Sequence, residues 1–93
     1  MDKKKLIAAR RKIDHLDMNI FNLIKKRTNI VKHMLKLKES KSQIVDHKRI
    51  NDILKNIKKK SIKNNIDPKV TTRIWKSMIW SYVDFQRRNF RKK

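Results

Sequence analysis

The sequence predicts an all-α protein with three helices, one long, one short and one of medium length. The 93 residues contain no glycine and one proline, and apolar residues recur three and four positions apart, as on a helix face. A chain of this length is expected to form a single domain, here residues 1–93. Because only 38% of the residues are hydrophobic, the core would be marginal and oligomerisation is expected.

The first helix is predicted to run from about Lys3 to Glu39. Asp2 precedes it and is a suitable N-cap, since its carboxylate can accept a hydrogen bond from the free amides of the first turn. The stretch SKSQIV, residues 40–45, then breaks the helix with polar residues that do not favour it. The second helix is predicted to follow Asp46 and to end near Lys63.

Asn64 and Asn65 follow the second helix, and in a chain without glycine they are the residues best suited to a left-handed C-cap. Asp67 and Pro68 then read as the N-cap and first-turn proline of the third helix. This helix is predicted to continue to about Phe90, and the last residues, Arg91 to Lys93, are expected to fray. The third helix has an i, i+4 stripe formed by Ile74, Met78, Tyr82 and Gln86. Gln86 therefore places a neutral amide where an apolar side chain is expected.

The net charge is +20, from 28 Lys and Arg against 8 Asp and Glu, and it favours an anionic partner. A nucleic-acid-binding protein is one interpretation, based on the cluster Lys58–Lys60 and on Arg87, Arg88 and Arg91. The alternative is that most lysines only solvate the surface. No apolar run approaches the roughly 20 residues that span a membrane, and no secretory signal is recognised. A cytoplasmic protein without a membrane partner is therefore expected.

Metal and disulfide sites are not expected. The chain has no cysteine, which excludes disulfides and thiolate ligands. His15, His33 and His47 lack the spacing of zinc ligands and are interpreted as surface or interface residues. The tryptophans and phenylalanines of the third helix are interpreted as core or interface anchors.

The first helix carries a coiled-coil-like seam that charged residues interrupt. Steps of four and three give the series Leu6, Arg10, Ile13, Asp17, Ile20, Ile24, Arg27, Val31, Met34, Lys38. A helix of this length would be about 55 Å long, whereas a compact monomer would have a radius of gyration of about 12–13 Å. We therefore expect it to pack along the same helix of a second chain.

The seam cations have two interpretations. In the first, the cations reach water or pair with Asp17 across the interface. In the second, they surround a pocket for an anion, which would balance their charge, since a buried unpaired cation is costly. Arg27 and Lys38 lie almost in phase, about 16 Å apart along the axis, and long side chains could converge on one ligand. Arg10 is about 25 Å from Arg27, so it would serve the site of the partner chain. A nucleic-acid-binding function does not explain cations within the seam, and is the less favoured alternative.

Four parts of the chain carry a family resemblance: RRKIDHLDMNIFNLIKKR, the lysine in LKLK, IVDHKRI and IDPKVTTRIWKSMIWSYVDFQ. Together they resemble the all-helical chorismate mutase family. The resemblance extends from Leu6 to Gln86. The positions that match the family's functional residues are Arg10, Arg27, Lys38, Asp46, Arg49 and Gln86. The resemblance implies an intertwined homodimer of three-helix chains, in agreement with the length of the first helix.

Two positions depart from the mutase pattern. Ile50 stands where mutases usually have a glutamate that receives the C4 hydroxyl of chorismate, and Tyr82 stands where they usually have serine. The isochorismate-pyruvate lyases of this family have an aliphatic residue and a tyrosine there, whereas Asp46 remains mutase-like. The resemblance therefore implies a lyase that converts isochorismate to salicylate and pyruvate, with chorismate mutase as the alternative. Ile50 could instead belong to the core of the second helix.

The resemblance also implies roles for the site residues. Lys38 and Gln86 would donate to the breaking ether oxygen, and Arg27 with the partner's Arg10 would bind the two carboxylates of a small dicarboxylate substrate. Arg49 would support this charge network, and Asp46 would cap the second helix or contact substrate through its backbone. Both reactions are pericyclic, so no nucleophile, cofactor or metal is expected.

Overall fold

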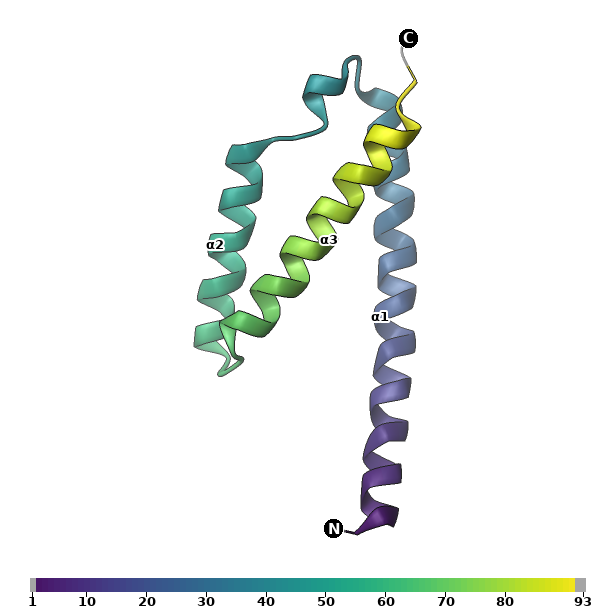
Figure 1. Cartoon of the computed structure of the whole chain (residues 1–93), viewed down its shortest axis with the longest axis vertical. Helices are drawn as coiled ribbons and strands as arrows, with labels where there is room; N and C mark the ends of the chain where they lie inside the picture. The colour runs from purple at the N-terminus through teal and green to yellow at the C-terminus, as the bar shows by residue number, and fades with distance from the viewer. Residues whose placement is uncertain (1, 92–93) are drawn as a thin grey trace. The chain divides into compact units, whose positions relative to one another are not determined.

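The computed structural model describes residues 2–91 of the chain and consists of helices (Figure 1). They are α1, Lys3–Leu37; a 3-10 turn η1, Lys41–Gln43; α2, His47–Lys63; and α3, Pro68–Asn89. No strand occurs among the described residues. The predicted all-α class and the long, short and medium order are confirmed. The fraying predicted for the last residues falls mainly on Lys92 and Lys93, which lie outside the described residues.

Short polar residues begin each helix as the sequence predicted. The Asp2 carboxylate accepts from the backbone amide of Lys4 at 2.9 Å, and the Asp46 carboxylate accepts from that of Arg49 at 3.0 Å. Asp67 accepts in the same way from the amide of Lys69 at 2.9 Å. Each bond satisfies one of the four amides that a helix start leaves free.

Two helix ends differ slightly from the prediction. α1 stops at Leu37 rather than Glu39, because the Gln43 side chain folds back over the break. Its Oε1 accepts from the amides of Glu39 at 2.6 Å and Ser40 at 3.1 Å. α3 stops at Asn89, one residue before the predicted end.

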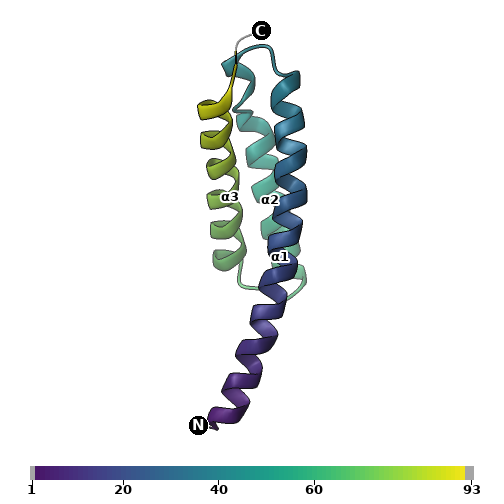
Figure 2. The same cartoon turned by 90° about the vertical axis from the view of Figure 1, so that its right-hand side faces the viewer.

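Asn65 provides the left-handed residue between α2 and α3. It has φ 57°, whereas Asn64 keeps a negative φ of −100°. Asparagine tolerates this region better than other non-glycine residues. The chain reverses here, so α2 and α3 form an antiparallel hairpin (Figure 2), and the two helices contact each other.

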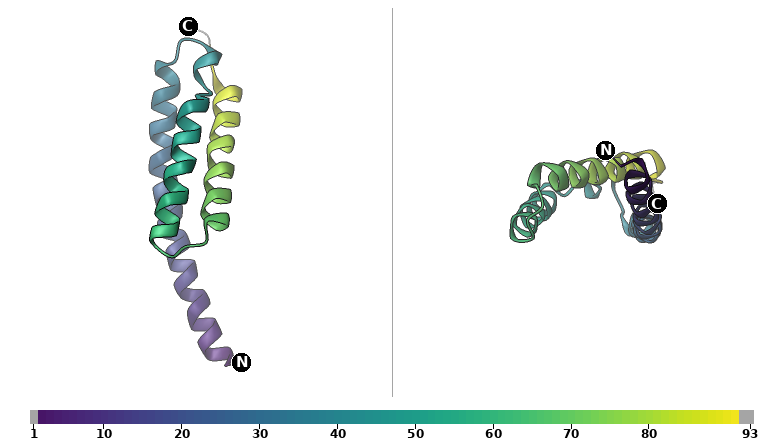
Figure 3. Two further views of the ribbon diagram at one scale, coloured as in Figure 1. Left: turned by 90° about the vertical axis from the view of Figure 1, so that its left-hand side faces the viewer. Right: turned by 90° about the horizontal axis from the view of Figure 1, so that it is seen from below.

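The hairpin buries a narrow core. Ile50 of α2 and Ile79 and Val83 of α3 are buried, and a polar contact near the turn joins the same two helices. The buried hydroxyl of Ser61 donates to or accepts from the Thr71 hydroxyl at 2.6 Å, and Ser61 Oγ also lies 2.6 Å from the carbonyl of Ile57. α2 and α3 contact each other, and the left view of Figure 3 shows the turn that joins them at one end of the hairpin.

The face of α3 that is buried differs from the predicted stripe. Ile74 is exposed and Met78 and Tyr82 are half-buried, whereas the buried residues of this helix are Ile79, Val83 and Gln86. Gln86 therefore follows an i, i+4, i+7 series rather than the predicted i, i+4 series. The amide is nevertheless inside, as its position among apolar residues suggested.

The chain divides into two compact units, Met1–His33 and Met34–Lys93. The first consists of α1 up to His33, and the second contains the last turn of α1, the break and the α2–α3 hairpin. The single domain expected over residues 1–93 stays a prediction. None of the described helices is both long and apolar enough to cross a membrane.

Candidate active site

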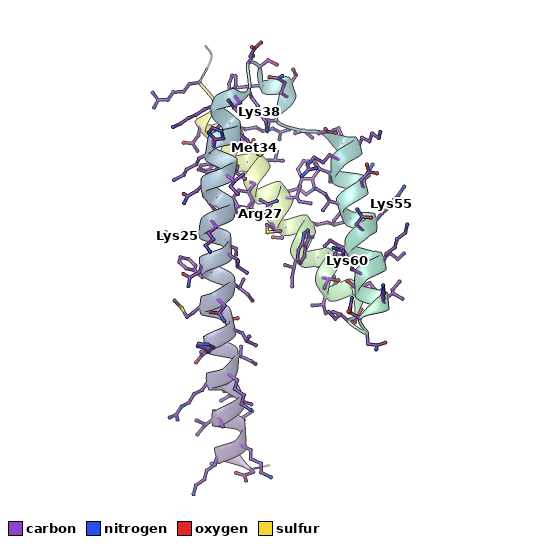
Figure 4. All side chains as sticks on the ribbon, turned by 180° about the vertical axis from the view of Figure 1, so that it is seen from behind. Lys25, Arg27, Met34, Lys38, Lys55 and Lys60 are labelled. Carbon is purple, nitrogen blue, oxygen red and sulfur yellow. The ribbon has the colours of Figure 1, made fainter. Side chains whose placement is uncertain are left out.

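Lys38 and Gln86 meet in the second unit. Lys38 follows the last residue of α1, and Gln86 lies in the last two turns of α3. The ammonium Nζ of Lys38 donates to Gln86 Oε1 at 2.6 Å. Figure 4 shows the Lys38 side chain at the C-terminal end of α1, one turn beyond Met34. Two residues 48 positions apart in the sequence are thus joined by a direct hydrogen bond.

The amide of Gln86 is held at both ends. While Oε1 accepts from Lys38, Nε2 donates to the backbone carbonyl of Tyr82 at 3.2 Å. Gln86 is only 7% exposed. The side chain therefore has a defined orientation, with one N–H of the amide group still free of the Tyr82 bond, because a primary amide carries two donors. The i, i+4 spacing of Tyr82 and Gln86 makes this backbone contact possible.

Lys38 is a cation in partly desolvated surroundings. Burial lowers the pKa of Lys38 from its usual 10.5, because water no longer fully solvates the charged ammonium. Its hydrogen-bond partner is a neutral amide, which cannot offset the charge as a carboxylate would. An ammonium has three N–H donors and the bond to Gln86 uses one of them. The remaining donors suit an anionic oxygen of a ligand.

The second unit also contains the other residues predicted on α2 and α3. Ile50 is buried, with 9% of it exposed, and Tyr82 is half-buried one turn before Gln86. Asp46 is the N-cap of α2, and Arg49, whose amide it binds, has an exposed side chain. Of the two roles that the sequence left open for Asp46, the structure contains the cap.

Arg10 and Arg27 lie on α1 in the first unit. Arg10 is exposed and Arg27 is half-buried. Asp17, the acidic residue of the seam, is also exposed. Their predicted roles toward the two carboxylates of a substrate stay predictions, and so does the assignment of Arg10 to the partner chain.

One contact near the hairpin was not predicted. The His47 ring, at the start of α2, lies with its centroid 6.4 Å from that of Trp80 on α3, at a tilt of 51°. From the sequence, His47 was interpreted as a surface or interface residue and Trp80 as a core or interface anchor, and no spacing rule links positions so far apart. Rings at this distance and tilt make a favourable edge contact, so His47 helps to hold the start of α2 against α3.

These features provide donors rather than a nucleophile or a general base. A partly desolvated cation and an oriented neutral amide would both stabilise negative charge that develops on one ligand oxygen. A search of curated proteins and a search of solved structures gave no significant match. In contrast, the family model described as chorismate mutase type II matches residues 9–87, which is most of the chain. The chain therefore belongs to the chorismate mutase type II family.

Proposed function

We propose that this protein is an isochorismate-pyruvate lyase, which converts isochorismate to salicylate and pyruvate. In this reaction the ether C–O bond breaks, and one ring hydrogen passes to the terminal methylene carbon of the enolpyruvyl group. The two products then account for all atoms of the substrate, and no oxidant or metal is required. The single observation that carries the choice of the lyase over the mutase is Ile50, a buried apolar side chain next to Arg49.

Lys38 and Gln86 would stabilise the transition state of this reaction. Negative charge grows on the ether oxygen as the bond breaks, and donors that face this oxygen bind the transition state more tightly than the substrate. The Lys38–Gln86 hydrogen bond of 2.6 Å supports this role, because it holds the cation and the amide beside one another before a ligand arrives. Preorganised donors require no rearrangement at the moment of reaction.

Ile50 would determine which substrate is preferred. Chorismate carries a ring hydroxyl at C4, and a buried hydroxyl without a partner costs about 1–3 kcal/mol. An isoleucine offers no acceptor, so a pocket lined by Ile50 would disfavour chorismate relative to isochorismate, which lacks this hydroxyl. Chorismate mutase, which forms prephenate from chorismate with the same ether cleavage, is the alternative function that the family supports.

The substrate preference is tested by replacing Ile50 with glutamate. With the wild-type protein we expect salicylate fluorescence to appear from isochorismate, and little prephenate from chorismate. Ile50→Glu introduces an acceptor for the C4 hydroxyl, and is expected to shift the ratio of the two kcat/KM values toward chorismate by about 10- to 100-fold. The ratio does not depend on the fraction of folded protein, and Ile50→Leu is the matched control that should preserve it. Prephenate without salicylate from the wild type would establish the mutase alternative instead.

We also propose that two chains form a homodimer with shared active sites. Apolar residues of the α1 seam support this proposal, because they are exposed in the single chain. Ile13, Ile20 and Ile24 are between 40% and 56% exposed. Leu16 and Leu23 widen the same stripe and are exposed as well. A stripe of this size needs a cover in water, and a second α1 with the same pattern would provide one.

Mixing two inactive variants tests the shared site. Arg10→Ala and Arg27→Ala should each lose most turnover, since each removes one carboxylate ligand from both sites of the dimer. If every site combines Arg27 of one chain with Arg10 of the other, a mixed dimer has one intact site and one doubly defective site. An equal mixture, after subunit exchange, should therefore recover about 25% of wild-type activity. Differently tagged subunits show whether exchange has occurred. If exchange occurs and activity is not recovered, both arginines belong to the site of the same chain.

A further inference from the structure

We propose that a group of exposed cations around the Lys38–Gln86 pair captures the dianionic substrate and directs it to the site. These rim cations are Lys36, Lys41, Arg87 and Arg91. The inference rests on the proposed function, since it takes a small dicarboxylate as the substrate. It goes further in assigning a role to particular surface charges, which otherwise only contribute to the net charge of +20.

The Lys38–Gln86 hydrogen bond brings together the two stretches of the second unit that carry the rim cations. Because Lys38 Nζ lies 2.6 Å from Gln86 Oε1, the end of α1 and the last turns of α3 meet at this bond. Lys36 and Lys41 flank Lys38 in the sequence, and Arg87 and Arg91 follow Gln86. All four side chains are exposed, whereas Lys38 is half-buried.

Little negative charge offsets these cations. Asp84 is paired with Arg88 at 2.9 Å, so both of these charges are already compensated. Glu39 is the remaining acidic residue in the two stretches 36–43 and 84–91. The rim therefore carries an excess of positive charge beside a partly desolvated cation.

An excess of this kind raises the local concentration of a dianion. Clefts lined by one sign of charge increase association rates by about 10- to 1000-fold, and the gain declines with ionic strength. The Debye length is about 10 Å at 0.1 M salt, so only charges near the site act at that concentration. This range separates the rim cations from lysines elsewhere on the surface.

The α2–α3 turn provides a matched control. Thr71, which binds Ser61 at this turn, and Gln86 are about 22 Å apart along the axis of α3. Lys59 and Lys69 are exposed and lie in the sequence near this turn, and Figure 4 shows the neighbouring Lys60 on the part of α2 that leads into it. Reversing two charges there changes the net charge by as much as reversing two rim charges.

The test compares Lys41→Glu/Arg91→Glu with Lys59→Glu/Lys69→Glu. Lys41 and Arg91 lie outside α1, α2 and α3, so their reversal changes no side chain within these helices. At about 0.1 M salt we expect the rim variant to lose about tenfold in kcat/KM for isochorismate while kcat is preserved. The control variant should stay within about twofold of the wild type, and the rim variant should approach the wild type at about 1 M salt, where the Debye length is about 3 Å.

Equal losses of kcat/KM in the two variants, or no loss in either, would overturn the role of the rim cations in substrate capture. The proposed function would still stand, since the wild type would still form salicylate. A loss in the rim variant that is confined to kcat, or that persists at high salt, would also overturn the role of the rim cations, because steering acts before the chemical step. Absence of wild-type turnover of isochorismate would overturn the proposed function and the capture of this substrate together.

Discussion

Lys38→Met is expected to lower kcat/KM by about 100- to 1000-fold, the effect of removing one preorganised donor to a developing oxyanion. Methionine preserves an unbranched apolar side chain of similar length but cannot donate to the ether oxygen. Steady-state formation of salicylate, or of prephenate if the mutase alternative holds, measures the effect. Lys55→Met removes an exposed charge on α2, outside the rim, and is the matched control; it should retain kcat/KM.

The fold should tolerate Lys38→Met. Partial burial lowers the pKa of Lys38, so the charged ammonium is less favourable in the folded chain than in water. This penalty is present below the lowered pKa and disappears as pH rises through the usual value of 10.5. Methionine removes the penalty at neutral pH, which offsets the donor lost to Gln86. We therefore expect a melting temperature close to that of the wild type by circular dichroism.

The pH profile of the wild type provides a second readout for Lys38. The ammonium is the form that binds and stabilises anionic oxygen, so kcat/KM should decline as pH rises through its lowered pKa, on the acid side of 10.5. Turnover that is unaffected by Lys38→Met would contradict the proposed role. A protein that bound only nucleic acid, with 28 basic residues, would hardly respond to the loss of one half-buried lysine.

Gln86→Glu is expected to reduce turnover by about 100-fold at pH 7.5 and to recover part of it in acid, because it places a carboxylate against Lys38. The Lys38 cation keeps this introduced carboxylate ionised at neutral pH. In that form it neutralises the cation and repels the dianionic substrate. Protonation at lower pH restores a neutral donor and acceptor in place of the amide.

A pH–rate profile from pH 8 to pH 5 measures this recovery for Gln86→Glu. Gln86→Leu is the matched control, since it removes the amide without adding a titratable group and should be impaired at every pH. If the two variants lost the same activity with the same pH dependence, Gln86 would have a packing role rather than a role at the ether oxygen. Circular dichroism at each pH verifies that both remain folded.

Local chemistry explains why the helix boundaries were predicted well. A capping aspartate acts within three residues of itself, as Asp46 does on the amide of Arg49, so its effect is visible in the sequence. The left-handed Asn65 is likewise a local requirement, since the chain has no glycine to adopt that conformation. The end of α1 was less accurate because Gln43 binds back to Glu39 and Ser40, and a polar stretch allows several such folds.

The sequence by itself determined the helical class, the order of the helices and the family, because capping, periodicity and residue spacing are properties of neighbours along the chain. Only the tertiary structure decided which apolar stripe of α3 is buried. The series containing Ile74 and the series containing Ile79 are both apolar, and contact with α2 selects the second. It also decided the orientation of the Gln86 amide and the lowered pKa of Lys38. Both depend on the contact between Lys38 and Gln86, which are 48 positions apart in the sequence. Residue spacing along the chain does not predict such a contact.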